Sequence, residues 1–252
     1  MKLHILDGYI QKIYLVEYPH GLLLLDGCSR PDVSLLRDFI QQTLARPFSD
    51  LKLVVVTHMH PDHAGAAHTL RDLTSCQIVS GVVDRPWYRG MSGWLMFATD
   101  LILTQWVAGR IGKRRQNVWY SPVLRPDRQL ADGQSLPGFE DWQVVTTPGH
   151  TDRDISLWHM PSNKMYVADL MVQVKGRFCP PFPVFHPNQY RASLHKVRAM
   201  QPAALWLAHV GEVTLTDTQF EHVLTLAPNK PKTHWRATKL KVRQLILRTS
   251  KN

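Results

Sequence analysis

Short apolar runs separated by turn residues divide this chain into strands and helices. The β-branched run 51–56 predicts a buried strand, and the alternation of apolar and turn residues over 1–26 predicts a β-meander. Further strands are expected at 77–79, 142–146, 155–159, 164–167 and 204–207, and helices at about 31–44, 64–72 and 187–200. Because strands and helices interleave in both halves, the pattern predicts an α/β fold, a four-layer αβ/βα sandwich of two mixed β-sheets with the helices outside.

The positive charge is concentrated at the C-terminal end. The 252 residues include 44% hydrophobic residues, as in ordinary globular proteins, and carry a formal net charge of +10. Residues 229–252 hold eight Lys or Arg and no Asp or Glu, so residues 1–228 contain 22 basic and 20 acidic residues. We therefore expect one domain over 1–228 and a basic C-terminal helix or tail over 229–252. A charge confined in this way does not favour a nucleic-acid partner.

The tail itself has two interpretations. Apolar residues fall near one face of a predicted helix, namely Trp235, Val242, Leu245 and Ile246. This helix either docks on the domain with its lysines in water, or contacts an anionic partner, of which a membrane surface is favoured over nucleic acid.

The cysteines indicate a reducing compartment. Cys28, Cys76 and Cys179 are odd in number and widely spaced, which favours reduced thiols over a disulfide framework. The first residues show no continuous apolar segment and no small-residue cleavage site, so they do not read as a signal peptide. Both features predict a cytoplasmic protein.

Four side chains able to bind a metal follow the predicted strand 51–56. His58, His60, Asp62 and His63 form the pattern His-x-His-x-Asp-His. In an extended segment His58 and His60 point the same way and can reach one ion, whereas Asp62 and His63 fall where a helix begins and can face a second ion. Imidazole and carboxylate ligands suit zinc, with iron or manganese as alternatives.

This segment and several others resemble the metallo-β-lactamase superfamily. Thr57 to Gly65 is similar to its signature, and the other similarities follow in the family's order over about residues 1–215: Asp26 after an early strand, Asp132-Gly133, Thr147-Pro148-Gly149-His150-Thr151, Asp169 and His209. The Pro-Gly-His-Thr form is nearest the branch of glyoxalase-II-like thioesterases and lactonases. The resemblance implies that His58, His60 and His150 hold one metal, that Asp62, His63 and His209 hold the second, and that Asp169 bridges them.

Two positions depart from the family pattern. Ala168 stands where the family usually has Gly, and Val210 separates His209 from Gly211, where the family usually has His-Gly. Both changes reduce the freedom of the backbone next to a ligand. They bear on the fine geometry and on occupancy of the second metal, but remove no ligand.

The implied chemistry is hydrolysis. Two cations that share a water lower its pKa and give a hydroxide that attacks a carbonyl carbon, while one cation stabilises the oxyanion. Asp62 and His63 are the expected catalytic residues, and Asp62 is suited to orient the water or pass a proton. We expect a small-molecule acyl substrate: a carboxylic thioester, ester or lactone. The alternatives are a phosphodiesterase or nuclease that uses the same metals, and a metal-binding protein without turnover.

Two segments are expected to border the active site. Residues 85–128 are crowded with large apolar side chains, and Asp100 is the only charge between Met91 and Gly109. At the centre of a membrane span Asp100 would cost ~2.5–3.5 kcal/mol. We therefore expect a helical insertion that covers the active-site edge, forms a homodimer contact or touches a membrane surface. In the proline-rich loop after Asp169, three residues are candidates for substrate contact: Phe182, His186 and Tyr190.

Overall fold

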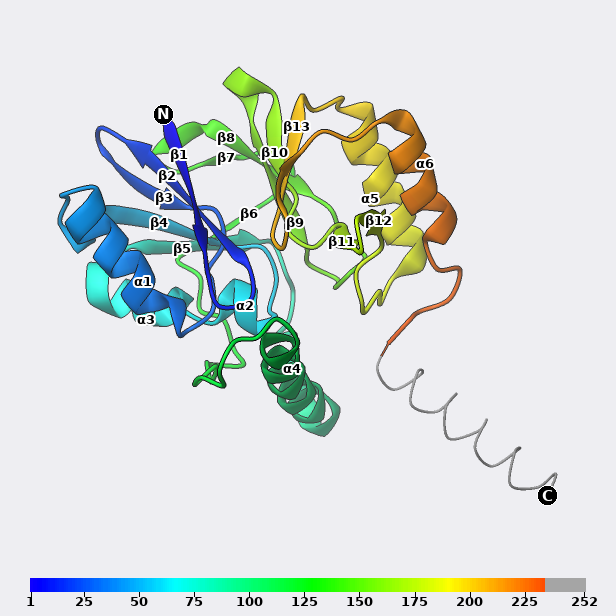
Figure 1. The fold of residues 1–252 in the computed structure, drawn as a ribbon, viewed down its shortest axis with the longest axis horizontal. Helices are drawn as coiled ribbons and strands as arrows, with labels where there is room; N and C mark the ends of the chain where they lie inside the picture. The colour runs from blue at the N-terminus through cyan, green and yellow to red at the C-terminus, as the bar shows by residue number, and fades with distance from the viewer. Residues whose placement is uncertain (234–252) are drawn as a thin grey trace.

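Two six-stranded sheets form the centre of the molecule in the computed structural model, which describes residues 1–233 (Figure 1). The first sheet has the order β1(Lys2–Asp7), β2(Lys12–Tyr18), β3(Gly21–Leu24), β4(Leu51–Val56), β5(Gln77–Gly81), β6(Arg128–Leu130). The second has the order β14(Gly211–Val213), β13(Ala204–Leu207), β10(Lys164–Tyr166), β9(Ile155–His159), β8(Phe139–Thr146), β7(Ser135–Leu136). Each contains both parallel and antiparallel pairs, so both are mixed sheets.

Helices cover the outer face of each sheet. On the first lie α1(Asp32–Asp38), which continues as a π-helical turn over Phe39–Thr43, and α3(Ala67–Thr74); on the second lie α5(Pro187–Ala199) and α6(Asp217–Leu226) (Figure 1). Short 3-10 turns occur at Phe48–Asp50 and Met160–Ser162, and a separate hairpin joins β11(Val172–Val174) to β12(Arg177–Cys179). The predicted four-layer sandwich is therefore confirmed.

The alternation of side chains along each inner strand explains these layers. In β2, Ile13 and Leu15 pack toward the helices, whereas Tyr14 and Val16 pack between the two sheets. A strand buried on both faces must be apolar throughout, which is why the sequence shows continuous apolar runs rather than alternation. A third cluster, with Leu205 in it, fills the space between the second sheet and its helices.

The predicted strands and helices are found where the pattern places them, with ends shifted by a few residues. The exception is the segment 85–128. Only α4(Gly90–Arg110) is helical, and residues 112–127 run without helix or strand. Gly112, Pro122 and Pro126 oppose continuation of the helix. Within residues 1–233 no helix has the length and apolarity needed to cross a membrane.

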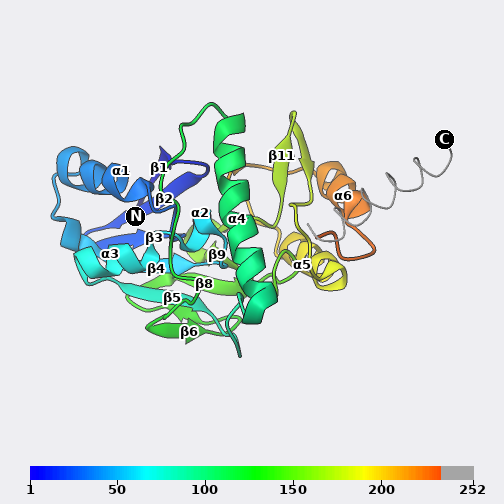
Figure 2. The same cartoon turned by 90° about the horizontal axis from the view of Figure 1, so that it is seen from below.

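The helix α4 projects from one edge of the sandwich. Seen from below, it crosses that edge between α2(Pro61–Ala64) and the hairpin β11–β12 (Figure 2). The loops after β4, β8, β10 and β13 gather at this edge as well. The first residues of the predicted tail stay on the domain, because Lys232 pairs with Val184 through two backbone hydrogen bonds of 2.8 and 2.9 Å. The apolar residues named above in the tail lie outside the described residues.

Candidate metal centre

The His-x-His-x-Asp-His segment joins strand β4 to the short helix α2. His60 has an extended backbone and caps α2, and its carbonyl oxygen accepts from the amides of His63 and Ala64. His60 therefore has an extended backbone, whereas Asp62 and His63 lie on the helical turn of α2. A Cβ atom at Gly65 would lie 2.1 Å from the Pro61 carbonyl oxygen, so only glycine permits this tight turn.

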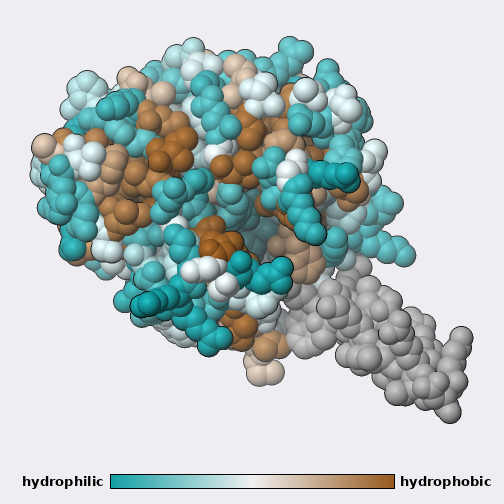
Figure 3. All heavy atoms as spheres, viewed as in Figure 1, coloured by the Kyte–Doolittle hydropathy of each residue, from teal (hydrophilic) through white to brown (hydrophobic). Residues whose placement is uncertain are grey.

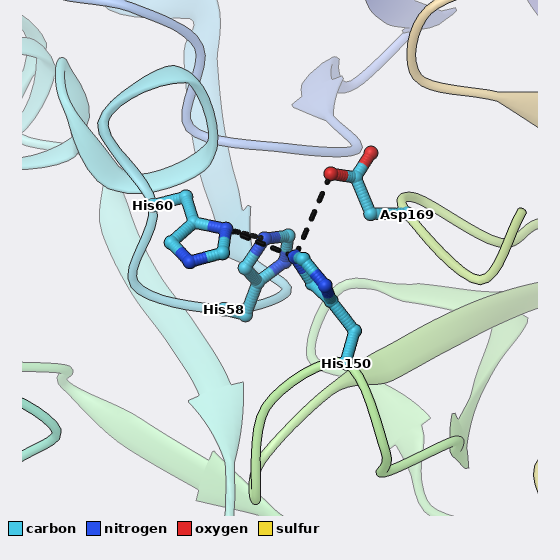
Figure 4. Close-up of side chains that lie close together, drawn as sticks. All are labelled: His58, His60, His150 and Asp169. Carbon is cyan, nitrogen blue, oxygen red and sulfur yellow. Dashed lines mark hydrogen bonds and ion pairs between the residues drawn. The ribbon is translucent and has the colours of Figure 1, made fainter. Parts of the chain in front are cut away.

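Three imidazoles and one carboxylate form the first group of candidate ligands. His60 Nδ1 lies 3.0 Å from His58 Nε2 and 2.9 Å from His150 Nε2, and the three rings face one point (Figure 4). Asp169 Oδ2 lies 3.7 Å from His150 Nε2. All four ligand atoms lie within 4.8 Å of one another. We call these four residues group one.

A second group lies on the other side of Asp169. Asp62 Oδ2 is 3.4 Å from His63 Nε2 and 3.5 Å from His209 Nε2. Asp169 Oδ1 is 3.5 Å and 3.2 Å from the same two nitrogens. We call Asp62, His63 and His209 group two. Because the two oxygens of Asp169 face different groups, this residue stands where a bridging ligand would.

Hydrogen bonds at the far side of three rings decide which nitrogen faces the site. His150 Nδ1 donates to the Pro183 carbonyl at 2.6 Å, and His209 Nδ1 to the Ile10 carbonyl at 2.8 Å. His63 Nδ1 donates to Asp26 Oδ2 at 2.6 Å. When neutral, each of these rings therefore presents an unprotonated Nε2 to its group, the form in which imidazole binds a metal.

Asp26 is the buried anchor of group two. Besides His63, its carboxylate accepts from the Thr57 hydroxyl at 2.8 Å and the Tyr166 hydroxyl at 3.0 Å. Its other oxygen accepts from the amides of Thr57 and Gly27, at 3.2 and 3.1 Å. The sequence pointed to Asp26 only through the family resemblance; these contacts show that it fixes the ring of His63.

The electrostatics of the two groups differ. Burial and the neighbouring imidazoles lower the pKa of His58 well below its usual value and that of His60 to about 3. Burial acts in the same direction on His63 and His209, but nearby carboxylates outweigh it. Asp62, Asp26 and Asp169 raise the pKa of His63 well above its usual value, and Asp169 raises that of His209 to about 9.

These residues fit divalent cations. Within residues 1–233, His63 Nε2 and Asp169 Oδ1 are buried without a hydrogen-bond partner, and both point into group two. Distances of 3.2–3.5 Å between the atoms of that group match the edge of a tetrahedron, about 3.3 Å, for ligand bonds of ~2.0–2.1 Å. All seven predicted ligands are thus brought together; that they bind metal stays a prediction.

Two aspartates near the candidate site were not predicted from the sequence as site residues. Asp154 shapes the loop of His150: its Oδ2 accepts from the amides of Gly149 and Thr151 at 3.1 and 2.7 Å. Asp side chains commonly accept hydrogen bonds from neighbouring backbone amides in turns. Gly149 has φ +145°, and a Cβ there would lie 2.4 Å from Tyr190 Cα.

The second is Asp100, which the sequence analysis weighed only as a charge in α4. Its Oδ2 lies 4.0 Å from His60 Nε2 and accepts from the Tyr88 hydroxyl at 2.9 Å. Tyr88 also lies within hydrogen-bond distance of the Met59 carbonyl, 2.9 Å, and of the Tyr120 hydroxyl, 3.0 Å. Burial raises the pKa of Asp100 to about 7. The insertion thus packs a buried polar cluster against the ligand segment. No local sequence pattern predicts this cluster.

The two departures from the family pattern have different consequences. Ala168 adopts φ +45°, in the left-handed region that favours glycine, immediately before Asp169. After His209, Gly211 takes φ +121°, so the extra residue Val210 moves the glycine one place along the chain.

Of the three candidate substrate contacts, Tyr190 is fully buried and its hydroxyl donates to the Leu170 carbonyl at 2.8 Å, so that candidate is wrong; Phe182 and His186 are exposed.

A four-layer αβ/βα sandwich with two histidine and aspartate groups at one edge defines a class of metal-dependent hydrolases. The family model of the metallo-beta-lactamase superfamily matches residues 6–209. The chain therefore belongs to the metallo-beta-lactamase superfamily, and the prediction of a metallo-hydrolase of this family is confirmed.

Two relatives of this chain are also described as probable metallo-hydrolases. "Probable metallo-hydrolase YqjP" of Bacillus subtilis (strain 168) is 26% identical over 171 residues, which cover 64% of this chain but only 52% of that protein. "Probable metallo-hydrolase YflN" of the same organism is 23% identical over 249 residues, 90% of each chain. The fold matches that of a metallo-beta-lactamase family protein from Thermus thermophilus, TTHA1429, with TM-score 0.63, 18% identity and coverage of 88% and 78% of the two chains.

Proposed function

We propose that this protein hydrolyses a carboxylic thioester, ester or lactone at a centre for two zinc ions, in the manner of the glyoxalase-II-like branch of its superfamily. The observation that carries the proposal is Asp169, whose two oxygens face two complete groups of ligands. Two cations held there would supply Lewis acidity, which lowers the pKa of water and polarises a carbonyl oxygen. The donor set also admits iron or manganese.

The chain's own residues have separate tasks in this proposal. His58, His60 and His150 face one point and hold the substrate side of the centre in place. Asp62, whose Oδ2 lies between His63 and His209 at 3.4 and 3.5 Å, orients the attacking water and passes its proton to the leaving group. His63, fixed by Asp26, keeps that geometry.

A cavity beside the ligand segment supports an acyl substrate. It has a volume of about 230 Å³, and His58 and Met59 form part of its wall. Apolar groups from the insertion line part of the rest: Pro86, Trp87, Pro122 and Leu124. Such walls suit the hydrocarbon part of an acyl chain or a lactone.

A phosphodiester is the second candidate. Arg85 and Arg153 line the same cavity, and guanidinium groups suit a phosphate. Because Arg153 is already paired with Asp152 at 2.8 Å, only part of this charge faces a ligand, and we place the carboxylic substrate first.

A cytoplasmic location is part of the proposal. All three cysteines are free thiols in the structure, and Cys28 and Cys76 are buried. Reduced thiols of this kind are usual in a reducing compartment.

Metal content and substrate class can be tested together. Elemental analysis of the purified protein would be run beside turnover of a panel of thioesters, lactones and bis-p-nitrophenyl phosphate. Asp169→Ala is the site variant, and Asp38→Ala, an exposed carboxylate on α1, is the matched control.

Two metal ions per chain, with chelator-sensitive turnover of carboxyl substrates that Asp169→Ala abolishes and Asp38→Ala preserves, would support the proposal. Turnover of the phosphodiester alone would replace it with the second candidate. Less than one ion per chain and no turnover would identify a degenerate site, with Ala168 and Val210 as the first positions to restore to the family pattern.

A further inference from the structure

The helix α4 has an inverted distribution of polar and apolar residues. Its buried positions recur at helical spacing and include two polar side chains: Gly93, Phe97, Asp100, Thr104 and Ala108. Its solvent face carries the large apolar ones, which are between 48% and 91% exposed: Met91, Trp94, Leu95, Ile102 and Trp106. Water-facing helices normally show the reverse pattern. A contiguous apolar face of this kind indicates a contact surface. We call these five exposed residues the α4 stripe.

Basic side chains lie at both ends of the α4 stripe. Residues 85–128 contain eight Lys or Arg and two Asp. Of the two acids, Asp100 is buried and Asp127 is hydrogen-bonded to the Ile78 amide at 2.7 Å. The exposed basic residues lie at both ends of the helix: Arg85, Arg89, Arg110, Lys113, Arg114 and Arg115. In the space-filling view, hydrophobic atoms lie over α4 at the bottom of the molecule, next to strongly hydrophilic ones over the loop that follows it (Figure 3).

We propose that the α4 stripe docks this protein on an anionic phospholipid surface. An apolar face inserts at the level of the headgroups while flanking cations bind acidic lipids, the arrangement of interfacial helices. Trp94 and Trp106 have the amphipathic rings favoured at that depth. The Arg110 guanidinium lies 5.3 Å from the centre of the Trp106 ring, so charge and aromatic surface meet at one place.

The local charge decides between lipid and a second copy of this chain as the occupant. Two copies joined through the α4 stripe would bring two sets of exposed arginines and lysines together, and Asp84 is the only exposed acid within residues 84–115 to balance them. Like charges at close range oppose association. An anionic bilayer has the complementary charge and accepts apolar groups of any shape.

Docking through this face would bring the ligand segment to the membrane. The opposite side of α4 holds Asp100, which lies 4.0 Å from His60 and forms a hydrogen-bonded cluster with Tyr88. A substrate dissolved in the bilayer would therefore meet the edge of the sandwich that carries the candidate metal centre.

Vesicle binding of the full chain tests the proposal. Co-flotation would be measured with vesicles of phosphatidylcholine alone and of phosphatidylcholine mixed with phosphatidylglycerol. The variant Ile102→Glu places a charge in the α4 stripe, at a position 68% exposed, and Leu73→Glu, at a position 54% exposed on α3, is the matched control. Circular dichroism would show that both variants fold, and sedimentation velocity would give the oligomeric state of each.

The expected result is binding to the anionic vesicles that falls about tenfold in Ile102→Glu and is unchanged in Leu73→Glu. Undiminished binding of Ile102→Glu would overturn the proposal, because it would assign any lipid contact to the basic tail. Absence of binding by the unmodified chain would overturn it as well. A dimer that Ile102→Glu separates into monomers, without vesicle binding, would assign the α4 stripe to a second copy.

Discussion

The two groups of candidate ligands share residue types but shift the pKa values of their histidines in opposite directions. Group one is a cluster of imidazoles in which burial and mutual repulsion lower the pKa of His58 and His60. In group two, buried carboxylates raise the pKa of His63 and His209. These shifts favour the neutral imidazole at His58 and His60 and the protonated imidazole at His63 and His209 before a metal arrives. The difference shows that the carboxylates around a histidine, not the histidine itself, decide the state in which it meets a metal.

This difference has a consequence for metal uptake. In group one, His58 and His60 can accept a cation without first losing protons, because their lowered pKa values favour the neutral imidazole. In group two a cation must displace protons from His63 and His209, so binding there releases protons and depends more steeply on pH. We therefore expect group one to hold its metal more firmly than group two near neutral pH.

Removing one candidate ligand from each group tests this difference most directly. His150→Ala should cost the metal of group one and His209→Ala that of group two, and each should lower turnover at least about a hundredfold, because a Lewis acid contributes several kcal/mol to the barrier. Elemental analysis after dialysis reads the two losses separately. His222→Ala, an exposed histidine on α6, is the control.

If His150→Ala and His209→Ala each lost both ions, the two groups would form one cooperative site and the contrast between them would fail. That outcome is possible because Asp169 contacts both groups.

The next largest effect concerns the support of group two. Asp26→Ala would leave His63 Nδ1, the Thr57 hydroxyl and the Tyr166 hydroxyl without their buried partner. We expect the free energy of unfolding to fall by roughly 3–5 kcal/mol, the usual cost of breaking a buried ion pair. Zinc affinity of group two should fall about ten- to a hundredfold. Denaturant unfolding with a chelator present measures the first, and competitive zinc titration the second.

Asp26→Asn keeps one acceptor oxygen and should lie between Asp26→Ala and the unmodified chain. Equal loss of zinc from both groups in Asp26→Ala would show a general loosening of the fold rather than a specific support of His63.

Group one has a different kind of support, from the insertion. Asp100→Ala would remove the carboxylate that faces His60 Nε2 at 4.0 Å, and we expect group one to bind metal about tenfold more weakly. The absorption spectrum of a cobalt-substituted protein should change as well, since the His60 ring would lose its fixed orientation. Asp100→Asn, which retains an oxygen, should restore most of the affinity. Loss of metal from group two instead would contradict this assignment.

Much of the candidate site was predictable because its candidate ligands lie in short local patterns. The run 51–56 followed by His58, His60, Asp62 and His63 needs only the geometry of a strand and a helical turn to indicate a metal centre. The layers of the fold were predictable as well, because continuous apolar runs such as that of β4 occur where both faces of a strand are buried.

Contacts between distant segments were not predictable in this way. Asp100 contacts Tyr88, 12 residues away, and lies beside His60, 40 residues away, so its role depends on how the insertion packs. The sequence predicted a helical insertion over 85–128, yet the helix ends at Arg110. The burial of Tyr190 depends likewise on Gly149, whose missing side chain lets the two backbones approach.

The smallest expected effect is on stability and concerns Asp132, which supports group one at the protein surface, whereas Asp26 supports group two in the interior. Asp132 Oδ1 accepts from Lys196 Nζ at 2.6 Å and from the Thr146 amide at 2.7 Å, at the end of the strand that leads to His150. Slight burial acts to raise the pKa of Asp132, but Lys196 and Thr146 lower it below its usual value. Asp132→Asn should reduce stability at neutral pH by less than about 1 kcal/mol, because the pair is exposed to solvent.

The pH dependence of this effect has a definite sign. A carboxylate whose pKa is lower in the folded than in the unfolded chain stabilises the fold above the unfolded pKa, about 3.9, and loses this contribution as the pH falls through the folded value. The stability difference between the unmodified chain and Asp132→Asn should therefore be constant near neutral pH and shrink below about pH 4. Urea unfolding with a chelator present would measure it without interference from metal loss. A difference that persists in acid would mean that the Thr146 hydrogen bond, and not the charge of Asp132, supports the strand leading to group one.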